Sequence, residues 1–229
     1  MKFRDAYKMM GYLRDLLEDL NILVFQFSMP VEDARGFALA DEVPSIIVIN
    51  TKDSIEARLF TLMHELGHII LGETVIDLPE VSLQVRNNIE AWCNTFSSAF
   101  LLPKEVSIDL FNKNKHNLTE TITLNALSKR YKVSKAVLLV KMVNLNYISK
   151  QEFESVLARY TPKETKAEKN GKKVMRMASD QRCLLEVGNK FVSLVANNFD
   201  REFITYNDAL SFLSIKSRNF DKVLARARK

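Results

Sequence analysis

The chain has 229 residues, of which 47% are hydrophobic and 27% are charged, and it carries a net charge of +5 at pH 7. These proportions predict a soluble globular protein that can bury a core, as one large domain or a domain with an appendage. No apolar run approaches the ~20 residues that a membrane span requires. Two cysteines, Cys93 and Cys183, do not make a disulfide framework, and no secretory signal is recognisable, so we expect a cytoplasmic location.

The first 50 residues predict one helix and three strands. Apolar residues fall at helical spacing from Phe3 to about Leu20. The β-prone stretch Ile22–Phe27 follows, and Gly36–Leu39 with Ser45–Asn50 then predicts a hairpin around a turn at 41–44. Because the last strand is apolar almost without interruption, we expect it to be buried.

The next stretch is a predicted helix that ends near Gly72. Apolar residues from Leu59 to Ile70 recur near the 3.6 period, and a glycine is a common stop after the last of them. Gly67, inside this helix, would allow another backbone to approach closely. The helix carries an H-E-x-x-H pattern at residues 64–68.

This pattern has a chemical meaning because residues four apart lie one above the other on a helix, so His64 and His68 present their imidazoles to the same point. Two neutral imidazoles on one rigid helix form half of a tetrahedral Zn²⁺ site. Glu65 lies about 100° round the helix, where it can act as a general base without being a ligand. The alternative is a buried helix with two hydrogen-bonded histidines, but these are two of only three histidines in the chain.

A third metal ligand is expected on a second apolar helix, which runs from Ile89 until Pro103 ends it. Glu90 is the only acid in that helix, and its apolar neighbours would make an unpartnered carboxylate costly. Asn94 lies one turn further on and could hydrogen-bond a ligating imidazole. Two alternatives stay open. Glu90 could be a surface residue at the start of a helix, where the helix dipole favours an acid. Cys93 is expected to be a small buried residue, but it could be a ligand because Zn²⁺ accepts thiolate.

The sequence resembles the ImmA/IrrE metallopeptidases, a bacterial and phage group often encoded beside helix-turn-helix repressors. The resembling stretches are Arg35-Gly36-Phe37, Ile46–Asn50, Phe60–His68 and Glu90–Pro103, with a weaker match to about Ser149 and near the C-terminus. The resemblance implies a zincin-like fold with His64, His68 and Glu90 as zinc ligands and Glu65 as the catalytic acid/base. Asn94 stands where thermolysin-type enzymes have an Asp. The resemblance also implies a protein substrate, a helix-turn-helix repressor of the XRE type encoded nearby.

Two segments around the zinc helix have open interpretations. Peptidases commonly hold an extended peptide against a sheet edge, so the small sheet either forms one wall of the cleft or only supports the zinc helix. The segment from Gly72 to Asn88 contains Glu73, Asp77 and Glu80. It is expected to be a solvated loop, with recognition of a basic peptide as the alternative.

The rest of the chain is predicted to be helical around one basic segment. The helix pair at Ile122–Met142 resembles a helix-turn-helix with Ser134 as a cap, but its second helix offers only Ser134, Lys135 and Lys141 among many aliphatic residues. We expect it to pack against the protein rather than read DNA. The basic stretch at 161–180 lacks aromatic residues that could stack on bases, so direct DNA binding is not expected there either. His116 is expected in an exposed polar loop.

The sequence as a whole predicts an α+β fold, mostly helical and zincin-like, with a small sheet beside the H-E-x-x-H helix. The expected divisions are a metallopeptidase domain at 1–117, a helix-turn-helix-like segment at 118–160, a basic linker at 161–180 and a small helical region at 181–229. The expected function is zinc-dependent hydrolysis of a peptide bond in a protein. The alternative is a regulatory binding module of a toxin–antitoxin-like pair with a structural or vestigial zinc site. No membrane partner is expected, and the oligomeric state is left open.

Overall fold

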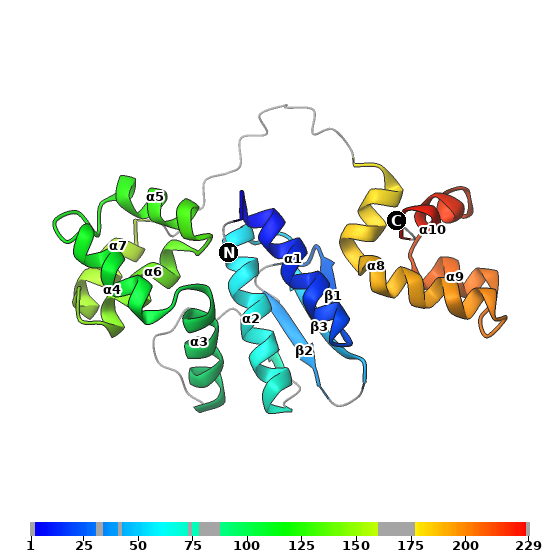
Figure 1. The fold of residues 1–229 in the computed structure, drawn as a ribbon, viewed down its shortest axis with the longest axis horizontal. Helices are drawn as coiled ribbons and strands as arrows, with labels where there is room; N and C mark the ends of the chain where they lie inside the picture. Colours follow the sequence, from blue (N-terminus) through cyan, green and yellow to red (C-terminus); the bar gives the residue numbers. More distant parts are fainter. Residues whose placement is uncertain are drawn as a thin grey trace.

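Three groups of elements make up the computed structural model, which describes residues 3–30, 34–40, 43–72, 75–77, 88–159 and 177–227 (Figure 1). The central group comprises α1 (Ala6–Asp19), β1 (Ile22–Phe27), β2 (Gly36–Leu39), β3 (Ser45–Asn50), α2 (Ile55–Leu71), β4 (Val75–Asp77) and α3 (Asn88–Leu101). A helical group follows with α4 (Lys104–Lys113), α5 (Thr121–Tyr131), α6 (Lys135–Asn144) and α7 (Lys150–Leu157). The C-terminal group comprises α8 (Ser179–Asp200), α9 (Tyr206–Phe212), the 3-10 turn η1 (Ser217–Asn219) and α10 (Phe220–Ala227). The predicted α+β class is confirmed.

The sheet has the strand order β1-β3-β2-β4, in which β1 and β3 are parallel and the other neighbours antiparallel. The three predicted strands have the predicted bounds. Of the predicted turn between β2 and β3, residues 41–42 lie outside the described residues. The fourth strand, β4, lies in the segment that we interpreted as a solvated loop. Its three residues are too few to give an alternation pattern in the sequence.

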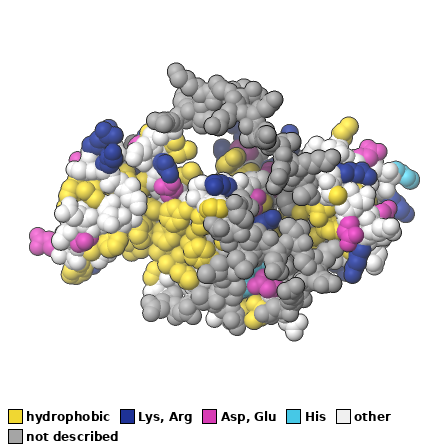
Figure 2. Space-filling view, turned by 180° about the vertical axis from the view of Figure 1, so that it is seen from behind, with side chains coloured by type: hydrophobic (Ala, Val, Ile, Leu, Met, Phe, Trp, Pro, Cys, Tyr) yellow, Lys and Arg dark blue, Asp and Glu magenta, His cyan; other side chains and the backbone are white. Residues whose placement is uncertain are grey.

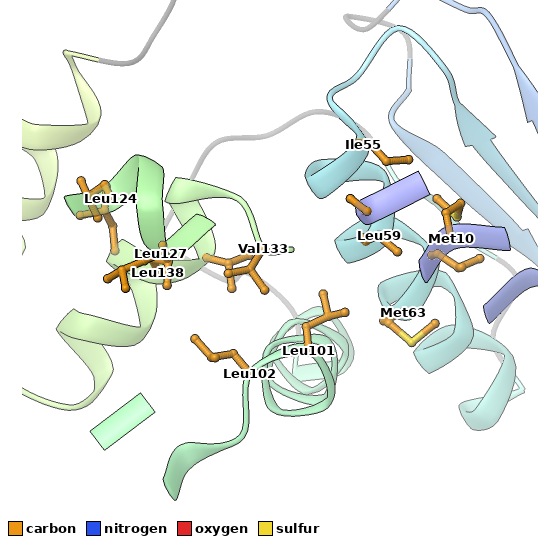
Figure 3. Packing of buried hydrophobic residues seen from close by; sticks show 14 of the residues in the cluster. Met10, Ile55, Leu59, Met63, Leu101, Leu102, Leu124, Leu127, Val133 and Leu138 are labelled. Carbon is orange, nitrogen blue, oxygen red and sulfur yellow. The ribbon is translucent and has the colours of Figure 1, made fainter. Parts of the chain in front are cut away.

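The core lies on the face of the sheet that α1 and α2 cover. Ile22 and Val24 of β1, with Ile47 and Ile49 of β3, alternate toward these helices and are buried. The same cluster of buried residues continues without a break into the helical group as far as Val156. Figure 3 shows its middle, where Leu101 and Leu102 at the end of α3 lie between the α1–α2 side and the α5–α6 side of the cluster.

The helix pair α5–α6 is packed onto this core. Ser134 caps α6 by accepting a hydrogen bond from the backbone N–H of Val137. Lys141 has only 8% of its surface exposed, and its Nζ donates to the carbonyl and hydroxyl oxygens of Ser98 at 2.9 and 3.1 Å. One of the three polar residues that the sequence offered for reading DNA therefore makes an internal contact with α3.

The C-terminal group has its own small core and lies against the central group. Its buried residues come from α8, α9 and α10: Cys183, Val187, Val192, Val195, Ala209, Leu213, Phe220 and Val223. Phe25 of β1 meets Phe191 of α8 edge-on, with ring centroids 5.1 Å apart. The predicted linker at 161–180 falls mostly outside the described residues, and α8 begins within its last residues.

Among the described helices, none is long and apolar enough to span a membrane. Figure 2 shows the molecule from the side opposite to Figure 1, with hydrophobic side chains gathered over part of this face.

The helix α8 is broken at Gly188, whose backbone (φ 84°, ψ 160°) is not helical. The break lies over a buried ion pair on α1, in which Arg14 Nε is 2.7 Å from Glu18 Oε1. Arg14 donates from Nη1 to the carbonyl of Leu185 at 2.7 Å, and Glu18 accepts from the backbone N–H of Lys190 at 3.2 Å. Arg14 thus contacts carbonyls at the C-terminal end of the first half of α8, and Glu18 contacts an N–H at the N-terminal end of the second half. Helix dipoles favour a cation at a C-terminal end and an anion at an N-terminal end.

Candidate metal centre

The helix α2 fixes the two histidines because both of its ends are defined by local chemistry. Ser54 caps its start by accepting from the backbone N–H of Ala57, and Gly72 ends it in the left-handed region with φ 71°. His64 and His68 lie one turn apart on the buried face, with 3% and 0% of their surfaces exposed. Their Nε2 atoms are 3.2 Å apart, so both rings point to one place.

The helix α3 crosses α2 at a very short distance, and this brings the third residue of the site into reach. A Cβ atom added to Gly67 would lie 2.9 Å from Cys93 Sγ and 3.3 Å from Cys93 Cα. The predicted close approach at Gly67 is therefore present, and its partner is α3. Cys93 is buried at this crossing and lies three residues after Glu90, which places the carboxylate beside the histidines.

Three side chains converge at this point. Glu90 Oε2 lies 3.1 Å from His64 Nε2, and Glu90 Oε1 lies 3.3 Å from His68 Nε2. One ligand atom from each of the three residues lies within 4.8 Å of the others. Two imidazole nitrogens and one carboxylate oxygen are a donor set typical of a catalytic zinc site, so the residues present fit that ion. Among the described residues, no other group of this kind is found.

Asn94 and Glu90 differ in what they contribute to this cluster. Asn94 Oδ1 lies 3.1 Å from His64 Nδ1, so a proton on Nδ1 would be held there and Nε2 left to bind a metal. The contact with His64 lowers the pKa of Glu90 against the opposing effect of burial, with smaller help from the charge of His68. The side chain of Glu90 is 30% exposed whereas those of the histidines are nearly buried, so solvent reaches the cluster from the Glu90 side.

Glu65 is fully buried on the same helix, next to the sheet. The strand β2 passes directly over it at Gly36, where an added Cβ would lie 3.4 Å from Glu65 Oε1, 2.5 Å from Thr61 Cγ2 and 2.9 Å from the carbonyl of Val48. Gly36 was not assigned a role from the sequence, although a glycine inside an apolar strand is a sign of close backbone approach. Its position brings the sheet within contact distance of the proposed base.

The remaining candidates lie elsewhere. Cys93 is not part of the cluster of three, and its sulfur faces Gly67. His116 is exposed in the loop between α4 and α5, as expected. The acidic residues of the 72–88 segment, Glu73, Asp77 and Glu80, carry side chains outside the described residues.

Of the comparisons with known proteins, the one with family models agrees with the donor set. A search of curated proteins found no match. Residues 17–142, more than half of the chain, match the family model of the IrrE N-terminal-like domain, a peptidase family. This range contains α2, α3 and every residue of the cluster. The chain therefore belongs to the IrrE N-terminal-like family and carries a metallopeptidase-like domain.

Proposed function

We propose that the protein is a zinc-dependent endopeptidase in which His64, His68 and Glu90 hold the ion and Glu65 is the general base. The observation that carries this proposal is the convergence of three zinc-type ligand atoms within 4.8 Å. Two of them come from α2, the helix that also carries Glu65, and the third comes from Glu90 of α3. Three protein ligands are the number found in catalytic zinc sites, which keep one position open, whereas structural sites are closed by a fourth.

Each side chain then has a separate task. A bound zinc ion supplies Lewis-acid chemistry, polarising the scissile carbonyl and acidifying water. The carboxylate of Glu65 accepts a proton from the attacking water and delivers it to the nitrogen of the leaving amine. Asn94 holds the His64 ring in its orientation through Nδ1. At Gly36 the strand β2 passes close to the Glu65 side chain, which is fully buried.

The substrate segment is proposed to bind in an extended form beside the sheet. The strand β4 is the outermost strand on the side of β2, and β2 contacts α2 at Glu65. An extended peptide added to such an edge is held by main-chain hydrogen bonds that do not depend on its sequence. The bond that is cut should therefore lie in a linker or a frayed helix end of the substrate rather than in a packed core.

The proposed substrate class is a helix-turn-helix transcriptional repressor encoded near this chain. Its support is the family resemblance, since members are often encoded beside such repressors. A folded repressor exposes few extended segments, which would make the enzyme selective without deep side-chain pockets.

The test is the substitution Glu65→Gln, which keeps the size of the side chain and removes the proton acceptor. Metal content by native mass spectrometry should be unchanged, while cleavage of the co-expressed repressor, followed by intact mass, falls at least ~100-fold. A chelator should stop cleavage by the parent. If the repressor stays whole with the zinc-loaded parent but is bound equally by parent and variant, the protein is a regulatory binding module instead.

A further inference from the structure

The C-terminal group contains a second pair of helices joined by a tight turn. α9 ends at Phe212, and the helical turn η1 begins at Ser217 and continues into α10, so four residues separate the two helices. Ser214, inside this turn, has a positive φ of 49°. A turn of this length is characteristic of the helix-turn-helix motif, whose turn often contains a glycine, the residue that most readily adopts a positive φ.

The packing of this pair also fits that motif. Four residues of the pair are 4% exposed or less: Ala209 of α9, Leu213 directly after it, and Phe220 and Val223 of α10. They share a core with residues of α8. Tyr206 links the two helices, because its hydroxyl is 2.8 Å from Ser217 Oγ and its ring meets Phe220 edge-on. The three helices therefore form a small unit in which the second helix of the pair has one buried and one free face.

The free face of the second helix is polar and cationic. Arg218, Asp221, Lys222 and Ala225 are all exposed and follow one another at intervals that place them on one stripe. Lys216 precedes the helix and is exposed, and Arg226 near its end pairs with Asp180 of α8. From Lys216 to Ala227 the chain thus has four cations and one acid. In Figure 1, α10 lies on the far side of α8 from the central sheet.

The pair α5–α6 lacks such a face. Its second helix buries Val137, Leu138, Leu139 and Met142, and also Lys141. A recognition helix must display polar side chains near its start to base edges in the major groove. Arg218 and Lys222 meet this requirement. The expectation of no direct DNA contact was based only on the Ile122–Met142 pair and on the basic stretch at 161–180.

We infer that the C-terminal group binds duplex DNA, with the start of the η1–α10 helix in the major groove and with Arg218 and Lys222 making the contacts. The Arg14–Glu18 pair and the contact between Phe25 and Phe191 join this group to the central group. DNA binding would therefore hold the metallopeptidase-like domain beside other proteins on the same DNA. This inference does not depend on catalysis.

The test compares two variants of the full chain that each lose two positive charges. Arg218→Gln with Lys222→Gln alters the proposed surface, and Lys172→Gln with Lys173→Gln, in the basic stretch, is the matched control. Binding to short duplexes of random sequence is measured by fluorescence anisotropy over a range of salt concentrations, using the Glu65→Gln background so that peptidase activity plays no part. Duplexes enriched by selection on the full chain are then measured in the same way.

The proposed surface predicts at least ~10-fold weaker binding for the Arg218/Lys222 variant, and a salt slope smaller by ~1 for each phosphate that the variant no longer neutralises. The control should change affinity less than ~3-fold on the selected duplexes. Equal effects of both variants would mean non-specific attraction to positive charge and would overturn the inference, as would no binding of the parent at low salt. Circular dichroism checks that the variants fold, which the exposure of both residues favours.

Discussion

Gly67 of α2 and Cys93 of α3 lie so close together that a Cβ atom on Gly67 would be only 2.9 Å from the Cys93 sulfur. This crossing fixes the distance between the helix of the two histidines and the helix of Glu90. Because Glu90 is three residues from Cys93, any increase in the separation of the helices moves its carboxylate away from both Nε2 atoms. The proposed zinc site thus depends on the absence of one methyl group.

The substitution Gly67→Ala should therefore weaken both the fold and the site. The new Cβ would force the helices apart or displace Cys93, which we expect to cost about 1–3 kcal/mol of unfolding free energy. Zinc affinity should fall as well, since Glu90 moves with α3. Urea unfolding and zinc titration measure the two effects.

A matched control is Gly11→Ala on α1, where an added Cβ meets nothing within 4 Å. Gly11 lies inside a helix, so this change should stabilise the protein by about 0.5–1 kcal/mol and leave zinc affinity unchanged. Equal effects of the two substitutions would show that the α2–α3 crossing is not tightly packed.

Removal of single ligands is the second prediction. Each of His64→Ala, His68→Ala and Glu90→Ala leaves two protein ligands, so bound zinc should be lost or greatly weakened in all three. Asn94→Ala removes only the contact to His64 Nδ1 and should cost about 10-fold in zinc affinity. Zinc content after dialysis gives the ranking. Full occupancy in Glu90→Ala would assign the third ligand to another residue.

The sequence predicted those features whose signal is local. The bounds of β1, β2 and β3 follow from short apolar runs between turn residues, and the H-E-x-x-H helix follows from a period and a motif. Glu90 and Asn94 could be proposed because they lie one turn apart in a helix with no other acid. Their approach to His64 was implied by chemistry rather than by any pattern of spacing.

Features that depend on distant parts of the chain could not be predicted. In the sequence, Arg14 and Glu18 have the pattern of ordinary polar residues on an amphipathic helix. Their hydrogen-bond partners, Leu185 and Lys190, are 171 and 172 residues away, so no local pattern indicates them. For the C-terminal part the sequence predicted only a small helical region at 181–229, because the turn of its helix pair has Ser214, not a glycine, in the left-handed conformation. Conversely, the buried state of Lys141 shows that a helix-turn-helix-like pattern can be used for packing.

Cys183 provides a third prediction, which concerns pH. Burial, helped by the charge of Glu186, raises the pKa of this thiol to about 11 from its usual 9.0. At pH 8 the folded chain should therefore hold ~100-fold less Cys183 thiolate than the unfolded chain and react correspondingly more slowly with iodoacetamide. The Cys93→Ala background leaves Cys183 as the only thiol.

The same shift gives the sign of a stability change at alkaline pH. Between about pH 9 and 11 the unfolded chain releases the Cys183 proton and the folded chain keeps it, so the contribution to stability is lost as pH rises through this window. Replacement of Cys183 by Ala should remove that part of the pH dependence. Equal alkylation rates at pH 8 in folded and unfolded chains would mean that α8 does not pack against α9 around this thiol.

A fourth prediction concerns the Arg14–Glu18 pair beneath the break in α8. Both side chains are buried, so Arg14→Met leaves a carboxylate without its cation and should cost about 3–5 kcal/mol. Adding Glu18→Leu removes that isolated charge, and the double variant should recover more than ~1 kcal/mol. Urea unfolding measures both values. A double variant no more stable than Arg14→Met would show that the two charges are not coupled.

Gly188 tests the same contact from the side of α8. A Cβ there would collide with Glu18 Oε1 and lie 2.5 Å from Arg14 Nη2, and its φ of 84° disfavours any other residue. Gly188→Ala should therefore separate α8 from α1, which hydrogen exchange would detect as faster exchange of the Lys190 amide, whose N–H donates to Glu18. Exchange in α2 should be unaffected, because the core between α1 and α2 does not include Gly188. Slow exchange at Lys190 in Gly188→Ala would show that the Arg14–Glu18 pair does not hold α8 against α1.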